Sequence, residues 1–135
     1  VGIEKARQVA LARGLSVTWL LEDVLRYEPA SESFDLVLLS YLQLPAQERQ
    51  NVLSMARDAL VPSGTLLFVA HDLSNLGRGI GGPRSVEVLC TPQDVVADLP
   101  GFHVLKAEVV TRDVEEDGKV VGVAFDTLVR ALKNP

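Results

Sequence analysis

Two polar residues, His71 and Asp72, directly follow an apolar run at residues 65–70. Histidine is the side chain best suited to act as a general base near neutral pH, because imidazole exchanges its proton there. We therefore predict that His71 is a catalytic base and that His71 and Asp72 both bind substrate. In the alternative interpretation, His71 only lines a pocket or is held by a backbone partner.

A second polar pair, Ser40 and Tyr41, lies within the last residues of a near-continuous apolar run at residues 33–42. Such a run is typical of a strand buried on both faces of a parallel sheet. Because ligands gather at the carboxyl ends of parallel strands, we predict that both residues lie beside a site. The alternative for Tyr41 is a packed aromatic ring with its hydroxyl at the rim.

The order of helical and strand patterns predicts the fold that positions these residues. We expect an α/β domain with a Rossmann-like, mostly parallel sheet and an antiparallel hairpin at its C-terminal edge, with residues 1–135 forming one domain. Glycine-rich residues 73–89 have no clear period and predict a mobile loop. The patterns predict helices at 3–13, 46–60 and 91–99, and strands at 17–21, 33–42, 65–70, 102–114 and 120–132.

The C-terminal half carries three local signals of strand and helix geometry. Asp117-Gly118 separates two Val-rich strand patterns and predicts a hairpin turn. The apolar phase slips at residues 104–105, which indicates a β-bulge. Thr91, Pro92 and Asp94 form the pattern of an N-cap, a first-turn proline and a partial capping box.

Composition excludes several classes of function. The chain has 135 residues, 47% of them hydrophobic, and a net charge of −5, which argues against nucleic acid as its main partner. Its single cysteine, Cys90, allows no internal disulfide and fits a cytoplasmic protein. No apolar run is long enough to cross a membrane. We interpret Cys90 and His103 as structural and expect no metal site, because neither has a second ligand at metal-binding spacing.

Several short motifs, in this order, are shared with a known family. The sequence Leu60-Val61-Pro62-Ser63-Gly64 is similar to a Leu-x-Pro-Gly-Gly turn, with Ser63 in place of one glycine. The chain resembles the class I S-adenosylmethionine-dependent methyltransferases, particularly the small bacterial enzymes of the tellurite-resistance type. The other matching motifs lie at residues 3–7, 22–24, 34–37, 41–45, 71–72, 81–83 and 91–92.

The resemblance implies roles for individual residues. Asp23 would accept a hydrogen bond from the adenine amino group, with the backbone N–H of Val24 meeting the ring. Ser40 and Tyr41 would lie near the methionine part of the cofactor and the substrate. Gln43 stands where relatives often carry histidine, so we expect it to bind substrate by hydrogen bonds rather than act as a base. Without the resemblance, Asp23 would be interpreted as a solvated acidic residue at a strand end.

The resemblance also identifies what the sequence lacks. The family's first strand, its glycine-rich turn and the acidic residue after its second strand are missing, and these hold the methionine and ribose parts of the cofactor. We therefore expect an N-terminally truncated part of an enzyme that methylates a small molecule, with weak or no cofactor binding by this fragment alone. The alternative is a non-catalytic remnant that forms a homodimer or binds another protein through an exposed sheet edge.

Overall fold

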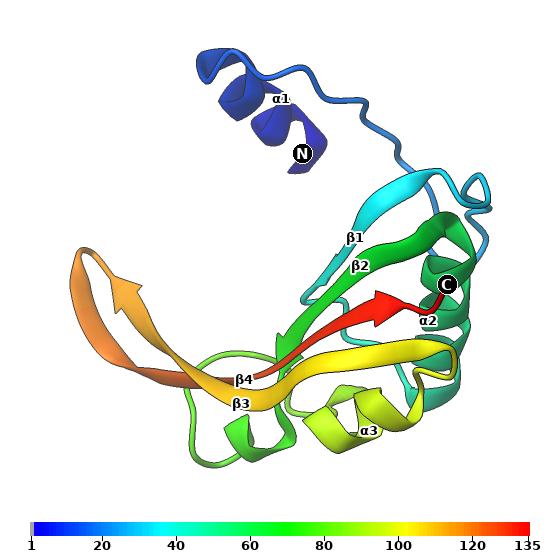
Figure 1. Ribbon diagram of the computed structural model, residues 1–135. Coiled ribbons are helices and arrows are strands. Elements are labelled where there is room, and N and C mark those ends of the chain that lie inside the picture. Colours follow the sequence, from blue (N-terminus) through cyan, green and yellow to red (C-terminus); the bar gives the residue numbers. More distant parts are fainter. Residues whose placement is uncertain (1) are drawn as a thin grey trace.

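The computed structural model describes residues 2–135 and contains one sheet with helices packed on one of its faces (Figure 1). Two short 3₁₀ turns, η1 (Leu73–Asn75) and η2 (Val86–Val88), lie in the segment between residues 71 and 92. The main elements in chain order are α1 (Gly2–Ala12), β1 (Phe34–Ser40), α2 (Ala46–Ala59), β2 (Leu60–His71), α3 (Pro92–Ala97), β3 (Phe102–Glu116) and β4 (Lys119–Lys133).

The four strands form a mixed sheet in the order β1-β2-β4-β3. β1 and β2 are parallel and are joined through α2, whereas β4 is antiparallel to both β2 and β3. The α/β class and the antiparallel C-terminal hairpin are therefore confirmed. Because β4 and β3 continue beyond the last residue that pairs with β2, the hairpin projects past the rest of the sheet (Figure 1).

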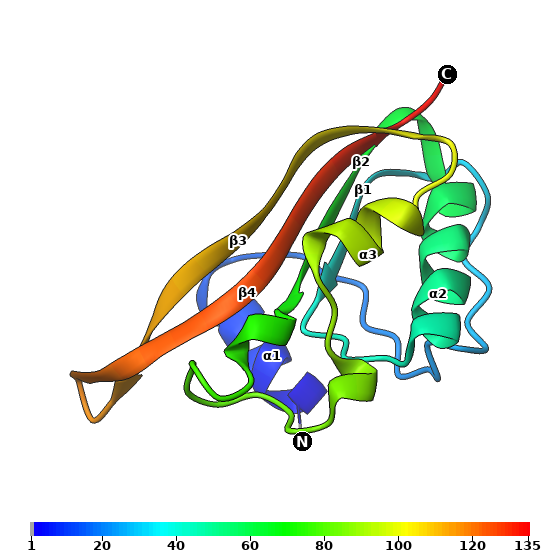
Figure 2. The same ribbon diagram turned by 90° about the horizontal axis from the view of Figure 1, so that it is seen from below.

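One face of the sheet packs on α2 and α3, which lie on the same side of it (Figure 2). Alternate residues of β2 point into this core, as the two-residue period of a strand requires. Full burial of one such aliphatic side chain contributes roughly 1.5–3 kcal/mol. The fully buried residues of the core include Leu53, Leu60, Leu66, Phe68, Ala70, Val95, Val129 and Ala131.

The prediction that the apolar run at residues 33–42 is buried on both faces was wrong. In β1, Val37 and Leu39 pack against the core, but Leu36 and Leu38 on the other face are 55% and 54% exposed. α1 makes no substantial contact with the sheet and lies apart from it (Figure 1). Within residues 2–135, nothing therefore covers the second face of β1.

The predicted strand at residues 17–21 is also absent, and this stretch is an extended coil. Leu20 and Leu21 are 59% and 88% exposed. A strand is stable only when a neighbouring strand satisfies its backbone hydrogen bonds. No strand of the described chain lies beside this stretch, so its β-forming residues have nothing to pair with.

Local signals in the C-terminal half were confirmed. Asp117 and Gly118 have φ values of 50° and 74°, as the two central residues of a type I′ hairpin turn require. The pairing of β3 with β4 shifts between Val104 and Lys106, which is the predicted bulge. The capping box at the start of α3 is complete, with reciprocal hydrogen bonds between Thr91 and Asp94.

The glycine-rich segment between β2 and α3 is held to the hairpin by a buried asparagine. The Asn75 side chain accepts a hydrogen bond from the Phe125 backbone N–H and donates one to the Gly81 carbonyl, both at 2.9 Å. Ile80 adds a backbone hydrogen bond to Val123. Where we predicted a mobile loop, the structure thus shows a segment fixed at several points.

None of the helices in residues 2–135 is long and apolar enough to span a membrane.

Candidate functional site

The register of the sheet places His71 directly opposite Asp126. His71 is the last residue of β2, and its partner on β4 is Asp126. Opposed residues of an antiparallel pair project from the same face, and His71 Nδ1 lies 3.3 Å from Asp126 Oδ1. Their side chains are 13% and 2% exposed, respectively, so the pair is sheltered from water.

Tyr41 reaches this pair from the end of β1. It has a φ of 51°, a left-handed conformation that is uncommon for residues with a side chain. Its ring centre lies 5.2 Å from that of His71, and its hydroxyl donates a 2.8 Å hydrogen bond to Asp126 Oδ2. Burial, reinforced by the hydrogen bond to Asp126, raises the pKa of Tyr41. The hydroxyl therefore keeps its proton and remains a donor.

β3 contributes a cation, Arg112, to the same group. Its Nε lies 3.1 Å from both Asp126 Oδ2 and the Tyr41 hydroxyl oxygen. These hydrogen bonds raise the pKa of Arg112, which stays charged. The Arg112 side chain is 45% exposed, and its terminal amino groups donate to no residue among 2–135. They are thus available to an anionic ligand.

We call Tyr41, His71, Arg112 and Asp126 the polar cluster. Across the sheet, Tyr41 directly follows β1, His71 ends β2, Asp126 lies on β4 and Arg112 lies on β3. The sequence prediction included Tyr41 and His71 but missed Arg112 and Asp126. A signal for Asp126 was present, because it is the only charged residue between Val120 and Val129 in an otherwise apolar strand pattern.

Gln43 braces the loop that follows β1. Its side-chain oxygen accepts a 2.8 Å hydrogen bond from the His71 backbone N–H, and its amide donates to the Val88 carbonyl at 2.7 Å. Gln43 thus lies beside the polar cluster, where we predicted it. Because both ends of its amide are already bonded to backbone, its role in substrate binding stays a prediction.

Gly82 brings the glycine-rich segment over the imidazole of His71. It has a φ of 78°, and a Cβ at this position would lie 2.7 Å from His71 Cδ2. No other residue fits there without displacing the ring or the loop. The segment therefore covers one side of the His71 ring.

Asp72 turns to the opposite face of the sheet. Its carboxylate accepts a 2.7 Å hydrogen bond from the Thr127 hydroxyl and a 2.8 Å bond from the Ser74 N–H, and the residue is 2% exposed. Asp72 therefore holds β2, β4 and η1 together. The structure does not bring it into the polar cluster, and its role in substrate binding stays a prediction.

The predicted cofactor residues Asp23 and Val24 lie in the coil that precedes β1. The Asp23 carboxylate is half exposed and has only local partners, accepting from the Leu25 N–H at 3.0 Å and lying 3.6 Å from Arg26. Ser40, the last residue of β1, is exposed and pairs with Val69. Among residues 2–135, the side chains of Asp23 and Ser40 form no hydrogen bond or ion pair with the polar cluster.

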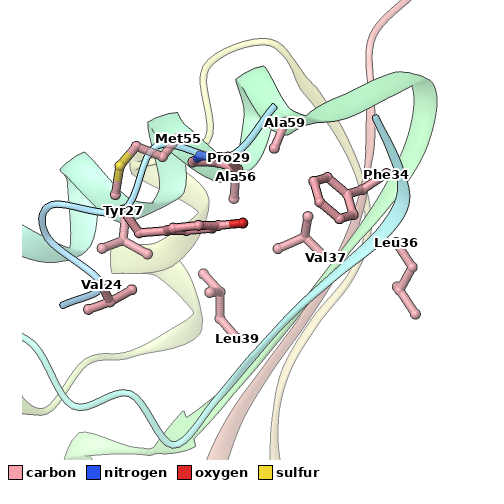
Figure 3. Close-up of a pocket in the computed structure, with 11 residues that line it drawn as sticks. Val24, Tyr27, Pro29, Phe34, Leu36, Val37, Leu39, Met55, Ala56 and Ala59 are labelled. Atoms are coloured by element: carbon pink, nitrogen blue, oxygen red, sulfur yellow. The ribbon is translucent and has the colours of Figure 1, made fainter. Parts of the chain in front are cut away.

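An apolar cavity of about 290 Å³ lies between this coil, β1 and α2. Figure 3 shows the ring of Tyr27 between α2 and β1, with its hydroxyl aimed into the cavity. Val24 and Pro29 come from the same coil, so apolar packing holds the segment that carries Asp23. The remaining lining residues are Phe34, Leu36, Val37, Leu39, Val52, Met55, Ala56 and Ala59.

The described residues contain neither a metal-binding cluster nor a reactive thiol. Within residues 2–135 no group of three or more His, Cys, Asp or Glu side chains is arranged to hold a metal ion. Cys90 is buried, and desolvation raises the pKa of its thiol to about 11, so it stays protonated and unreactive. The polar cluster is therefore the strongest candidate site in the described chain.

The fold is that of the S-adenosylmethionine-dependent methyltransferases, which confirms the resemblance at the level of the fold. No protein-family model and no curated protein matches the chain. Among solved structures, a protein from Methanosarcina mazei described as an S-adenosylmethionine-dependent methyltransferase has a TM-score of 0.65 and 16% identity. That match covers 96% of this chain and 76% of the other.

Two further structures are similar over nearly the whole chain. TehB from Haemophilus influenzae has a TM-score of 0.71 and 13% identity, covering 98% of this chain and 46% of TehB. A structure described for the conversion of a disulfide bond into a thioacetal during echinomycin biosynthesis has a TM-score of 0.75 and 16% identity, with 98% and 62% covered. The chain thus spans 62% of the length of the latter protein and about half that of TehB.

Proposed function

We propose that the chain is part of an enzyme that transfers a methyl group from S-adenosylmethionine to a small molecule. The observation that carries the proposal is the position of Tyr41 and His71, which meet at the carboxyl ends of neighbouring parallel strands. In open α/β sheets this edge is where ligands bind. The similarity of the fold to methyltransferases identifies methyl transfer as the reaction class to test first.

The described residues fit part of a pocket for this cofactor. The Asp23 carboxylate is half exposed and has room to accept a hydrogen bond from an adenine amino group. Tyr41 lies at the rim where the methionine part would end. When bound, S-adenosylmethionine supplies an electrophilic methyl group on sulfur. β1 has no strand on its outer edge within residues 2–135, so the chain builds only one wall of the pocket.

The contribution of the chain to the reaction is positioning and exclusion of water. Methyl transfer is a displacement that requires alignment of the acceptor atom with the methyl group. Tyr41 and Gly82 enclose His71 from two sides, and His71 can take a proton from an acceptor. Cofactor and acceptor would then meet at the end of β1 and β2.

Calorimetric titration tests the proposed function. The natural gene product that contains residues 1–135 should bind S-adenosylmethionine, and Asp23→Asn should weaken that binding about tenfold, the effect of roughly 1.4 kcal/mol. Asp113→Asn is the matched control, because Asp113 is exposed on β3. For the 135-residue chain alone we expect weak or no binding. Absence of binding by the natural gene product would overturn the proposal.

One observation supports a second function, association through β1. In the described part of the chain this strand pairs with β2 alone, and its open face carries the exposed Leu36 and Leu38. An uncovered apolar edge strand pairs readily with another chain. A non-catalytic module would use this edge without any need for the polar cluster, so the two functions depend on different residues.

A further inference from the structure

We propose that the polar cluster binds a ligand with an ionisable hydroxyl group, such as a phenol or an enol. In this site His71 accepts the hydroxyl proton, Arg112 binds the resulting oxyanion, and Asp126 is the residue that positions His71. The inference rests on the proposed function in one respect, because it makes this ligand the methyl acceptor. The binding site itself is argued from the side chains alone.

The first step concerns the free oxygen of Asp126. Its Oδ2 accepts hydrogen bonds from both Tyr41 and Arg112, whereas Oδ1 is buried and has no hydrogen-bond partner among residues 2–135. The Nδ1 of His71 is also buried and unpaired, and it faces this oxygen at 3.3 Å. Leaving a buried polar group without a hydrogen-bond partner is destabilising. A small rotation of the ring joins the two atoms and removes both penalties.

The second step follows from the direction of that hydrogen bond. A carboxylate only accepts hydrogen bonds, so its neighbour Nδ1 must carry the hydrogen. In neutral His71 the lone pair is then on Nε2. Nε2 forms no hydrogen bond with residues 2–135, and it is not fully buried. It is therefore the nitrogen that a ligand can reach.

The third step is the proton transfer and its charge balance. The O–H bond of the ligand breaks, the proton bonds to Nε2, and the electron pair stays on the oxygen. His71 and Arg112 are then positive and Asp126 is negative, so these three side chains carry a net charge of +1, which balances the charge of the oxyanion. Tyr41 is neutral because its pKa is raised, and the Asp72 carboxylate lies on the other face, bound to Thr127.

The transfer of a proton to imidazole also limits which class of hydroxyl group can be the ligand. Proton transfer to imidazole is efficient when the acidities of donor and acceptor are similar. Phenols and enols approach that range, whereas aliphatic alcohols are far weaker acids. The exposed terminal amino groups of Arg112 suit an oxygen anion, since guanidinium binds such groups in a fixed fork. We therefore infer an aromatic or enolic hydroxyl.

The first test needs no ligand and reports directly on Asp126. Nitrogen-15 NMR of the imidazole rings at alkaline pH distinguishes the two neutral tautomers, and His103, exposed on β3, is the internal reference. We expect the Nδ1–H tautomer for His71 and loss of this preference in Asp126→Asn, with His103 unchanged. A dominant Nε2–H tautomer in the wild-type chain would overturn the inference, even if the variant fails to fold.

The second test uses para-nitrophenol, whose anion absorbs visible light. At a pH where the free probe is mostly protonated, the wild-type chain should raise the anion absorbance. His71→Gln and Arg112→Gln should each reduce this rise at least fivefold, whereas Arg130→Gln, an exposed residue of β4, should not. Para-nitroanisole, which has no hydroxyl, is the control probe. Equal binding of both probes would overturn the site, because apolar contact would then explain it.

The outcomes of these two tests are independent of the outcome of the cofactor-binding test. A natural gene product that binds S-adenosylmethionine but shows the wrong tautomer would overturn this inference and leave the proposed function standing. A chain that ionises para-nitrophenol through His71, in a gene product that never binds the cofactor, would support the site and overturn methyl transfer.

Discussion

Tyr41 contacts three other side chains, and its hydroxyl can donate to one of them, Asp126, only while it is protonated. It donates to Asp126 Oδ2 and lies within hydrogen-bond distance of Arg112. Its backbone sits in the left-handed region, which costs energy that the surrounding contacts must offset. Removal of this one oxygen should therefore disturb both the cluster and the stability of the chain.

We expect Tyr41→Phe to lower the free energy of unfolding by about 1 kcal/mol, the usual contribution of one hydrogen bond. Because the pKa of Tyr41 is raised in the folded state, this contribution is complete below the ordinary value of 10.0. It declines as the pH rises above 10.0 towards the raised value. Urea denaturation of both proteins between neutral and alkaline pH measures the difference.

Tyr27→Phe is the matched control, because the Tyr27 hydroxyl forms no hydrogen bond with residues 2–135 and points into the apolar cavity. A loss of stability in Tyr27→Phe equal to that in Tyr41→Phe would contradict the assignment. So would a difference between wild type and Tyr41→Phe that grows as the pH rises above 10.0.

The sequence was sufficient to predict that Tyr41 and His71 lie at strand ends, because each comes at the end of an apolar strand pattern. It was not sufficient for Asp126 and Arg112. Their place in the cluster depends on which residue of β4 lies opposite His71, and this register is set by contacts among three strands. Sequence spacing alone does not determine such a register.

At the scale of elements, a buried ion pair joins α2 to the end of α3. Arg49 lies 2.8 Å from the Asp98 carboxylate, and their side chains are 9% and 7% exposed. Gln50 adds a 2.9 Å hydrogen bond to the other oxygen of Asp98. The carboxylate thus has partners on both oxygens, and all of them come from α2.

We expect Arg49→Ala to destabilise the chain by about 3–5 kcal/mol, because it leaves the Asp98 charge buried without its cation. Arg57→Ala, also on α2, removes a pair with Asp58 whose carboxylate is 63% exposed, and should cost less than about 1 kcal/mol. Thermal unfolding followed by circular dichroism compares the two. Equal losses would show that the buried pair is not a major link between the helices.

The elements also show which sequence signals are local and which depend on neighbours. The Asp117-Gly118 turn, the bulge at residues 104–105 and the capping box were predictable because a few adjacent residues determine each of them. The strand at 17–21 and the double burial of β1 were not, because both require a second element. The same residues would adopt the predicted structure only beside a strand and a helix that residues 2–135 do not provide.

At the scale of the molecule, the uncovered side of β1 is an exposed apolar surface at the edge of the sheet. Within residues 2–135 one edge of β1 is hydrogen-bonded and the other is not, and Leu36 and Leu38 expose more than half of their surface. Natural edge strands usually carry charges or are covered, because a bare apolar edge recruits other chains. A second copy of this chain is always present in solution, so at sufficient concentration it can pair with the open edge of β1.

We therefore expect the 135-residue chain to associate as its concentration rises and Leu38→Lys to shift this association to at least tenfold higher concentration. A lysine beside the edge opposes pairing, because its charge would be buried against the second copy. Val109→Lys is the control, since Val109 is 45% exposed on β3 at the opposite edge. Sedimentation velocity measures the assembly state. Association that Val109→Lys abolishes and Leu38→Lys spares would place the interface on β3, and the open side of β1 would then have no role in self-association.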